Sequence, residues 1–175
     1  ELLPTVRSRC RQITLPVPDV AAVRNWLTQQ GVKHPDLCLA LASASPLQAV
    51  VFNSDDYFAL YTDFIRQVSL PDSFDPISLA GKLHKLDLPD IVSWLQKWCY
   101  DLMSYRMTGK IRYHLQQEKI IKKLAATVDP VQLARFWRNL ITTQQLSRHP
   151  LNARLFLEEM LLSYLKVMAP ERYAS

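Results

Sequence analysis

Three arginines near the start of the chain are the residues best suited to chemistry. Arg7, Arg9 and Arg11 alternate with small residues, just before a run that alternates apolar and polar residues. On an extended chain the three guanidinium groups would project to one side. A guanidinium forms bidentate contacts with phosphate oxygens, and an arginine that reaches across an interface can stabilise the charge developing in phosphoryl transfer. The alternative interpretation is a basic surface strand.

Other catalytic or metal-binding patterns are missing from the sequence. The histidines lie on different expected elements without H-x-x-x-H or H-E-x-x-H spacing, so we expect no metal site and surface or half-buried side chains. They are His34, His84, His114 and His149. The acidic pairs at 55–56 and 158–159 are sequence neighbours, whose side chains diverge on a helix. Without a G-x-x-x-x-G-K-[ST] or G-x-S-x-G motif, we expect no nucleotide to be bound and hydrolysed by this chain alone.

Composition predicts an all-α protein. The 175 residues include 3 Gly against 11 Pro, and Pro is tolerated in the first turn of a helix whereas phosphate loops and sheets need Gly. With 49% hydrophobic and 21% charged residues, a disordered or collagen-like chain is excluded. No apolar run approaches the roughly 20 residues of a membrane span and no signal peptide is evident, so we expect a cytoplasmic protein without a membrane partner. Cys10, Cys38 and Cys99 are expected to be reduced thiols.

Start and stop signals predict a short extended segment at 11–18 followed by nine helices. Asp19 is an expected N-cap, Gly31 an expected left-handed C-terminal cap, and Asp129 precedes a Pro at another helix start. The expected helices are residues 19–31, 35–43, 46–52, 55–68, 76–85, 90–107, 117–127, 130–147 and 151–168. A Pro-, Ser- and Asp-rich stretch at 69–76 predicts a domain boundary. The expected parts are a connector (1–18), a helical domain (19–70) and a five-helix domain (71–175).

Charge is unevenly divided between the two predicted domains. Residues 1–75 hold 6 Lys and Arg against 8 Asp and Glu, whereas residues 76–175 hold 15 against 8, a net charge of +7. Lys119, Lys122 and Lys123 are candidate nucleic-acid contacts in this basic region. The alternative is a solvated helix face, because charge clusters are often no more than that.

The aromatic residues of the C-terminal part are expected in the core or in a subunit interface. Trp94 and Trp98 are four residues apart, and Phe136, Leu140 and Ile141 recur at helical spacing. This spacing favours packing over stacking on nucleic acid bases.

Two segments resemble clamp-loader subunits of the AAA+ family. Ser8-Arg9-Cys10 resembles the S-R-C motif that closes their nucleotide-binding domain, and residues 151–165 are similar to the N-x-R-L-x-L-E-x-L-L-L pattern of a subunit of the bacterial DNA polymerase III loader. The resemblance implies a fragment containing an AAA+ helical lid at 19–70 and a five-helix collar at 71–175, with the AAA+ module itself absent.

The same resemblance implies a role for Arg9 as an arginine finger, offered in trans to ATP on a neighbouring subunit. At the start of the third lid helix, ATPase subunits carry an arginine that senses nucleotide, whereas Leu47 stands at this place here. That difference fits a subunit that assists hydrolysis without performing it, and argues against an ATPase subunit.

The partners implied are the gamma/tau ATPase subunits and delta, and indirectly the sliding clamp and primed DNA. Interface residues expected from the last helix are Arg154, Phe156 and Tyr164. No cofactor is expected on this chain itself. The alternative function is a basic helical nucleic-acid-binding module.

Overall fold

The chain is described by a computed structural model that covers residues 5, 8–11, 19–42, 45–53, 55–149 and 152–173. Within these ranges the regular secondary structure is helical, without strands, which confirms the all-α prediction. The expected extended segment lies outside the described residues except for Arg11. Among the helices of the described ranges, none is long and apolar enough to cross a membrane.

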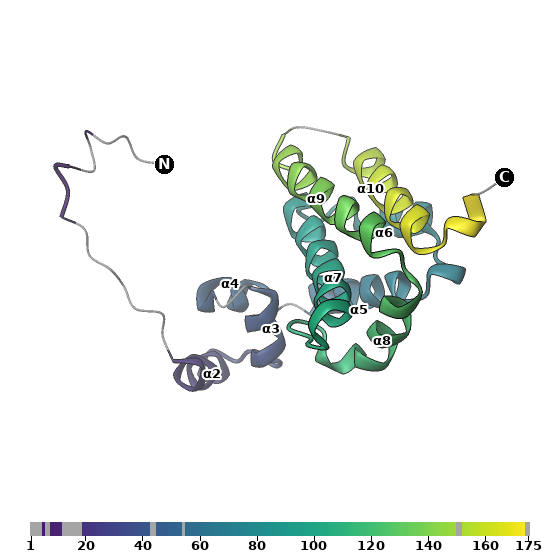
Figure 1. Cartoon of the computed structure of the whole chain (residues 1–175). Helices are drawn as coiled ribbons and strands as arrows, with labels where there is room; N and C mark the ends of the chain where they lie inside the picture. Colours follow the sequence, from purple (N-terminus) through teal and green to yellow (C-terminus); the bar gives the residue numbers. More distant parts are fainter. Residues whose placement is uncertain are drawn as a thin grey trace.

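Nine α-helices run through the described part of the chain (Figure 1). They are α2 (Val20–Gln29), α3 (Pro35–Leu41), α4 (Pro46–Val51), α5 (Asp55–Val68), α6 (Pro76–Leu83), α7 (Leu88–Thr108), α8 (Glu118–Thr127), α9 (Pro130–Leu146) and α10 (Ala153–Met168). Short 3-10 turns form η1 (Pro71–Ser73), η2 (Leu115–Gln117) and η3 (Pro170–Tyr173). Each expected helix is present, with ends that differ by at most two residues.

Local capping explains where several helices begin and end. The Asp19 carboxylate accepts hydrogen bonds from the backbone of Ala21 and Ala22, and the Asp129 carboxylate accepts one from Val131. These bonds satisfy amide groups that have no partner inside the helix. Gly31 follows α2 with φ of 77°, the left-handed conformation that glycine adopts without strain. The caps predicted at Asp19 and Gly31 are confirmed, and α9 begins at the Asp129-Pro130 start that the sequence predicted.

Helix α7 is the centre of the bundle. It packs against α8 and α9, while α10 packs against α6 and α9. In Figure 1, α2, α3 and α4 form a group at one side of the larger bundle of α5–α10. The predicted domain boundary at residue 71 stays a prediction, although α5, which precedes it, contributes side chains to the core around α7.

Two buried tryptophans join α7 to its neighbours through hydrogen bonds. Trp94 Nε1 donates to the Tyr57 hydroxyl of α5 at 2.9 Å, and Trp98 Nε1 donates to the Tyr164 hydroxyl of α10 at 2.8 Å. The Tyr164 hydroxyl in turn donates to the Val68 carbonyl at the end of α5, at 2.8 Å. Both indoles and Tyr164 are almost completely buried, so the two bonds of Tyr164 lie in the apolar interior, whereas the Trp94–Tyr57 bond is part-buried.

The prediction that aromatic residues fill the core is confirmed at these positions and at Phe136. Ile141 differs, because its exposed fraction is 46%. Helix α9 buries Leu133, Phe136 and Leu140, which recur every three or four residues. Ile141 follows Leu140 directly, and one helical step of about 100° turns it away from this face.

We expect Tyr164→Phe to lower the free energy of unfolding by about 1–3 kcal/mol, because it leaves the Trp98 indole N–H and the Val68 carbonyl without a partner in the core. Urea unfolding followed by tryptophan fluorescence measures the change. Tyr105→Phe, at a half-buried position, is the matched control and should change stability by less than about 0.5 kcal/mol. Equal stabilities for the two variants would contradict the role of this hydrogen-bond pair.

Candidate functional site

The arginine expected to act in trans lies on the surface. Arg9 is exposed and sits with Ser8 in a turn, where the Ser8 hydroxyl donates to the Thr5 carbonyl at 3.1 Å. The expected extended arrangement is therefore not seen at residues 8 and 9. Arg7 lies outside the described residues, so whether the three arginines share one side stays a prediction.

The expected interface residues of α10 fall into two environments. Arg154 has 58% of its side chain exposed and its Nε donates to Glu158 Oε1 at 2.8 Å, while Phe156 is half-buried. Tyr164 is fully buried in the core, where a partner subunit does not reach it. The Tyr164 hydroxyl is bonded to Trp98 and to the Val68 carbonyl. Of the three residues expected at an interface, Arg154 and Phe156 are the ones with accessible surface.

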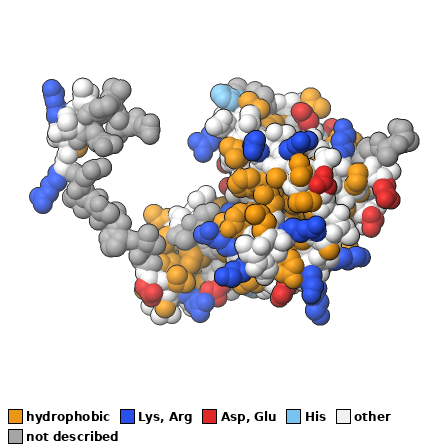
Figure 2. Space-filling model, in the orientation of Figure 1, with side chains coloured by type: hydrophobic (Ala, Val, Ile, Leu, Met, Phe, Trp, Pro, Cys, Tyr) orange, Lys and Arg blue, Asp and Glu red, His pale blue; other side chains and the backbone are white. Residues whose placement is uncertain are grey.

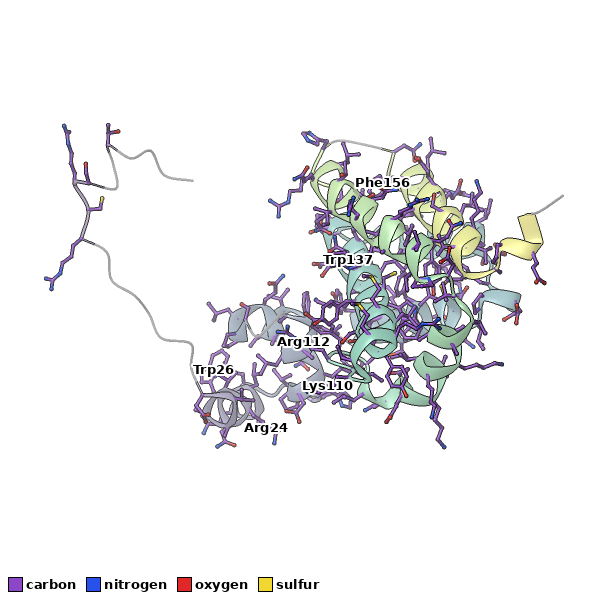
Figure 3. All side chains as sticks on the ribbon, in the orientation of Figure 1. Arg24, Trp26, Lys110, Arg112, Trp137 and Phe156 are labelled. Atoms are coloured by element: carbon purple, nitrogen blue, oxygen red, sulfur yellow. The ribbon has the colours of Figure 1, made fainter. Side chains whose placement is uncertain are left out.

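Helices α9 and α10 also expose apolar side chains that the prediction did not include. Leu155 is 63% exposed on α10, and Val131 and Ile141 are 55% and 46% exposed on α9. Trp137 is half-buried and donates its indole N–H to the Gln96 carbonyl at 3.3 Å. Figure 3 labels Trp137 and Phe156 on this side of the bundle. Figure 2 shows hydrophobic side chains gathered over α7 and α9, with Lys and Arg side chains around them. Exposed apolar area of this kind is typical of a surface that contacts another protein.

The three lysines that are candidates for nucleic-acid contact lie together on the surface. Lys119, Lys122 and Lys123 are all exposed on α8. Their spacing of three and four residues puts Lys119 next to the other two on the helix surface. Arg106 belongs to the same basic region but is engaged in the fold, since its Nη1 donates to the carbonyls of Ala125 and Ala126 at 2.6 and 3.1 Å. It therefore caps the end of α8 and is not free for a phosphate.

Among the described residues, a connected group of buried polar side chains and backbone groups is centred on Asp101, which the sequence analysis did not predict. Its buried carboxylate accepts hydrogen bonds from the backbone N–H groups of Arg112, Tyr113 and His114 at 2.8–3.2 Å. It also accepts one from His114 Nδ1 at 2.8 Å. Burial alone would raise the pKa of Asp101, but the hydrogen bonds from His114 and from the Arg112 backbone lower it below its usual value.

The prediction for His114 is wrong, because this side chain is only 3% exposed and not on the surface. Its ring lies beside Trp98, with centroids 5.2 Å apart. Asp101 explains how the imidazole is accommodated, since a buried polar ring requires a hydrogen-bond partner. The structure brings together no group of three or more His, Cys, Asp and Glu side chains that could hold a metal within the described ranges.

A second buried polar group ties the small helices to α7. Lys97 is 8% exposed, and its ammonium group donates to the Leu41 carbonyl at the end of α3. Burial lowers the pKa of Lys97 to about 8, and the nearby Asp90 only partly offsets this effect. The ammonium also lies 5.9 Å from the centroid of the Tyr113 ring. This contact holds α3 against the bundle and has no catalytic geometry of its own.

Comparison with known proteins identifies the family. The family described as "DNA polymerase III, delta subunit, C terminal" matches residues 55–165, which is α5 and most of the chain that follows it. Because the match covers more than half of the chain, the chain belongs to this family. The predicted relationship to DNA polymerase III clamp-loader subunits is confirmed.

One curated relative has a more specific name. DNA polymerase III subunit delta' of Pseudomonas aeruginosa is 25% identical to this chain over 179 residues. The alignment covers 97% of this chain and 55% of the relative, so the chain spans about half the length of the protein that it resembles.

The buried Lys97 predicts a pH-dependent contribution to stability. A lysine whose pKa falls from 10.5 to about 8 on folding binds fewer protons in the folded chain between these values, so its contribution rises with pH in that window. Burial raises the pKa values of Tyr61 and Cys99, so their contributions to the free energy of unfolding fall as the pH rises through this alkaline range. These contributions are the same in wild type and in a Lys97 variant. We therefore expect the stability difference between wild type and Lys97→Met to grow in favour of wild type, by up to about 3 kcal/mol, from pH 8 to 10.5.

Denaturant unfolding at fixed pH values measures this difference. Lys85→Met removes an exposed lysine and is the matched control, for which the difference should stay constant. A constant difference for Lys97→Met as well would contradict a depressed pKa at Lys97.

Proposed function

We propose that this chain acts as a delta prime subunit of the bacterial DNA polymerase III clamp loader. In this role it is a structural subunit that helps to assemble the loader ring, which places the sliding clamp on primed DNA during replication. The observation that carries the proposal is the family match across α5–α10, supported by the delta' relative that covers nearly the whole chain. Its direct partners in this complex would be the gamma/tau ATPase subunits and delta.

The surface proposed for assembly is formed by exposed apolar side chains of α9 and α10, two helices that pack against each other. Leu155 and Ile141 offer apolar area, while Arg154 and Phe156 lie on the same last helix as Leu155. An interface needs a well-packed apolar centre with polar groups at its rim, and this composition fits that requirement. The surface is distinct from the core, which holds Tyr164.

The proposed catalytic contribution is indirect and belongs to Arg9. Its exposure leaves the guanidinium available to ATP bound on a neighbouring subunit, where a planar, permanently charged group stabilises the transferring phosphoryl group. Leu47, at the second position of α4 and 74% exposed, stands where the family resemblance expects the nucleotide-sensing arginine of ATPase subunits. This difference supports the proposal that the chain assists ATP hydrolysis on a neighbouring subunit.

A nucleic-acid-binding module is the second candidate, favoured by the three exposed lysines of α8. In that case affinity for DNA would fall steeply with salt, and it would weaken when Lys119, Lys122 and Lys123 are replaced by Gln. Weak binding that disappears at physiological salt would count against this candidate, because any basic protein shows it.

Assembly is tested with the Leu155→Glu/Ile141→Glu double variant of the complete subunit. We expect it to elute separately from the purified ATPase and delta subunits in size-exclusion chromatography with light scattering, because two charges would be buried in the apolar interface. Leu47→Glu adds a charge at a still more exposed apolar position on α4 and should still co-elute. Normal assembly of the double variant would place the interface elsewhere.

The role of Arg9 is tested with Arg9→Ala in the complete subunit. The loader should assemble normally, but the ATP site that Arg9 completes should hydrolyse ATP on the order of a thousandfold more slowly. Clamp loading on primed DNA should therefore be slower, as measured by DNA-stimulated ATP hydrolysis and by clamp retention. Lys85→Ala, which removes an exposed positive charge elsewhere on the chain, is the control. Wild-type rates in the Arg9 variant would remove the finger from the mechanism.

A further inference from the structure

An open cavity of about 530 Å³ has no lining residue on α9 or α10, the helices proposed for assembly. Its walls come from α3, α5, the loop after α7 and the start of α8. Figure 3 shows Arg112 on the loop after α7. Ligand sites in proteins have volumes of roughly 300–1,000 Å³, so this cavity has room for more than one inserted side chain.

The accessible lining of the cavity is largely apolar. Leu37 on α3 and Phe58 and Ile65 on α5 contribute to it. Tyr61 and His114 also line the cavity, but the Tyr61 hydroxyl and His114 Nε2 are covered by surrounding atoms and offer nothing to a ligand. Binding in this cavity therefore depends mainly on the burial of apolar surface.

The rim of the cavity extends its apolar surface outward. Leu70, Leu115 and Ile120 line it and are 52%, 68% and 38% exposed. A small molecule held inside the cavity would leave these side chains in water. A polypeptide segment that lies across the opening would cover them, so the surface fits a polypeptide better than a small ligand.

The secondary structure around the cavity favours a helical segment. The part of the chain that the structure describes contains no strand, so it offers no free sheet edge to an extended peptide. An extended peptide would bring unpaired N–H and C=O groups against apolar side chains, which is unfavourable. A helix satisfies these groups internally and presents apolar side chains every three or four residues. An amphipathic helix therefore fits this surface better.

The ion pairs around the cavity leave an excess of positive charge. Asp36 is the only carboxylate among the described residues that line it, and it is paired with Arg24 at 2.7 Å. Arg66, also a lining residue, shares the Asp63 carboxylate with Lys82. Because three cationic groups share two carboxylates, these pairs carry a net positive charge.

Arg112 adds a cationic group at the edge of the cavity. Its guanidinium carbon lies 5.3 Å from the Tyr113 ring centroid, and no carboxylate of the described residues forms an ion pair with it. The charges of the exposed Glu118 and Lys119 at the start of α8 offset each other. Carboxylates of a partner helix would therefore find an unpaired cationic group here.

Both walls of the cavity are held in place by contacts inside the chain. The Asp101 carboxylate accepts hydrogen bonds from three consecutive backbone N–H groups of the loop that carries Arg112. Gly109 allows the chain to turn sharply before this loop, with φ of 69°. On the other wall, the Phe58 ring stacks on His34, which precedes α3, with centroids 4.9 Å apart. Walls that are fixed before binding lower the entropy lost on binding.

We propose that this cavity binds an amphipathic helix of a partner protein, with acidic residues on both sides of its apolar face. Apolar side chains of the helix enter between Phe58 and Leu115. The acidic residues lie near Arg66 on α5 and Arg112 on the loop after α7. This inference goes beyond the clamp-loader assignment and does not rest on it.

The test uses three capped peptides, added to the 175-residue chain. The Glu peptide is Ala-Glu-Leu-Glu-Ala-Leu-Leu-Ala-Glu-Leu-Glu-Ala, which as a helix carries a stripe of Leu with Glu on both sides. The Lys peptide has Lys in place of every Glu. The rearranged peptide, Glu-Leu-Ala-Glu-Ala-Glu-Leu-Leu-Ala-Leu-Glu-Ala, has the same composition but spreads its Leu side chains around the helix. Methyl resonances in NMR spectra report where each peptide binds and how tightly.

We expect the Glu peptide to shift the methyl signals of Leu37, Ile65, Leu115 and Ile120 in a saturable way. At low salt it should bind about fivefold or more tightly than the Lys peptide, and this ratio should fall as the salt concentration rises. The rearranged peptide should bind about fivefold or more weakly than the Glu peptide, because only part of its Leu surface faces the cavity at one time.

Two pairs of variants separate the apolar contact from the charge. Leu115→Glu changes an exposed rim residue and should weaken binding of the Glu peptide about tenfold or more without unfolding the chain. Met107→Glu, at an exposed apolar position outside the cavity lining, is the matched control and should leave binding unchanged. Arg112→Gln should lower the preference for the Glu peptide over the Lys peptide about threefold, whereas Arg138→Gln on α9 should not.

Several results would overturn the proposal. Equal affinity for the Glu and Lys peptides would show that the cationic groups do not select an acidic partner. Equal affinity for the rearranged peptide would show that no helix face is recognised. Sodium decanoate binding more tightly than the Glu peptide would identify a site for small amphiphiles. Concentration-dependent dimerisation that Leu115→Glu removes would identify a second copy of this chain as the occupant. No shift of the lining methyl groups with any peptide at millimolar concentration would leave the cavity without this function.

Discussion

Two tryptophans of one helix hold the larger bundle together. Trp94 and Trp98 lie one turn apart on α7, and each directs its indole N–H to a tyrosine hydroxyl on a different neighbouring helix. An indole buries a large apolar area but also carries one N–H, which must be satisfied when it is buried. The positions of α5 and α10 against α7 therefore depend on hydrogen-bond geometry as well as on packing. The exposed face of α9 and α10 follows from this arrangement, because α10 is oriented by its inner side.

Asp101 fixes the loop between α7 and α8, as the two tryptophans fix α5 and α10. A single buried carboxylate organises the loop between α7 and α8, and with it the His114 ring and one wall of the cavity. A buried charge is tolerated only when hydrogen bonds replace the water that it has lost. The three backbone N–H groups and the imidazole provide this replacement. The fold thus places a rigid, basic loop next to an apolar depression.

Sequence reasoning succeeded where the determining interactions are local. The caps at Asp19, Gly31 and Asp129 need only neighbouring residues, and the core face of α7 follows from the spacing of Trp94 and Trp98. The family resemblance came from short motifs at the two ends of the chain.

Sequence reasoning failed where contacts with residues distant in the sequence determine whether a side chain is buried. His114 is buried only because Asp101 lies beneath it, and Tyr164 is internal only because Trp98 and Val68 meet its hydroxyl. One signal was present in the sequence, since Asp101 falls three residues after Trp98 on a mostly apolar stretch of helix. An acidic residue so placed requires partners, but helical periodicity cannot say which segment supplies them.

The hydrogen bond between Tyr164 and Val68 joins residues 96 positions apart in the sequence. Contacts of such long range form late, because most of the intervening chain must be ordered before the ends can meet. On the ribosome, α5 and α7 are made well before α10 leaves the exit tunnel. The Trp98 indole and the apolar surface around it are then uncovered during synthesis. Newly made chains are therefore most prone to aggregation in the interval before the last helix packs, which is the stage at which a chaperone would be of most use.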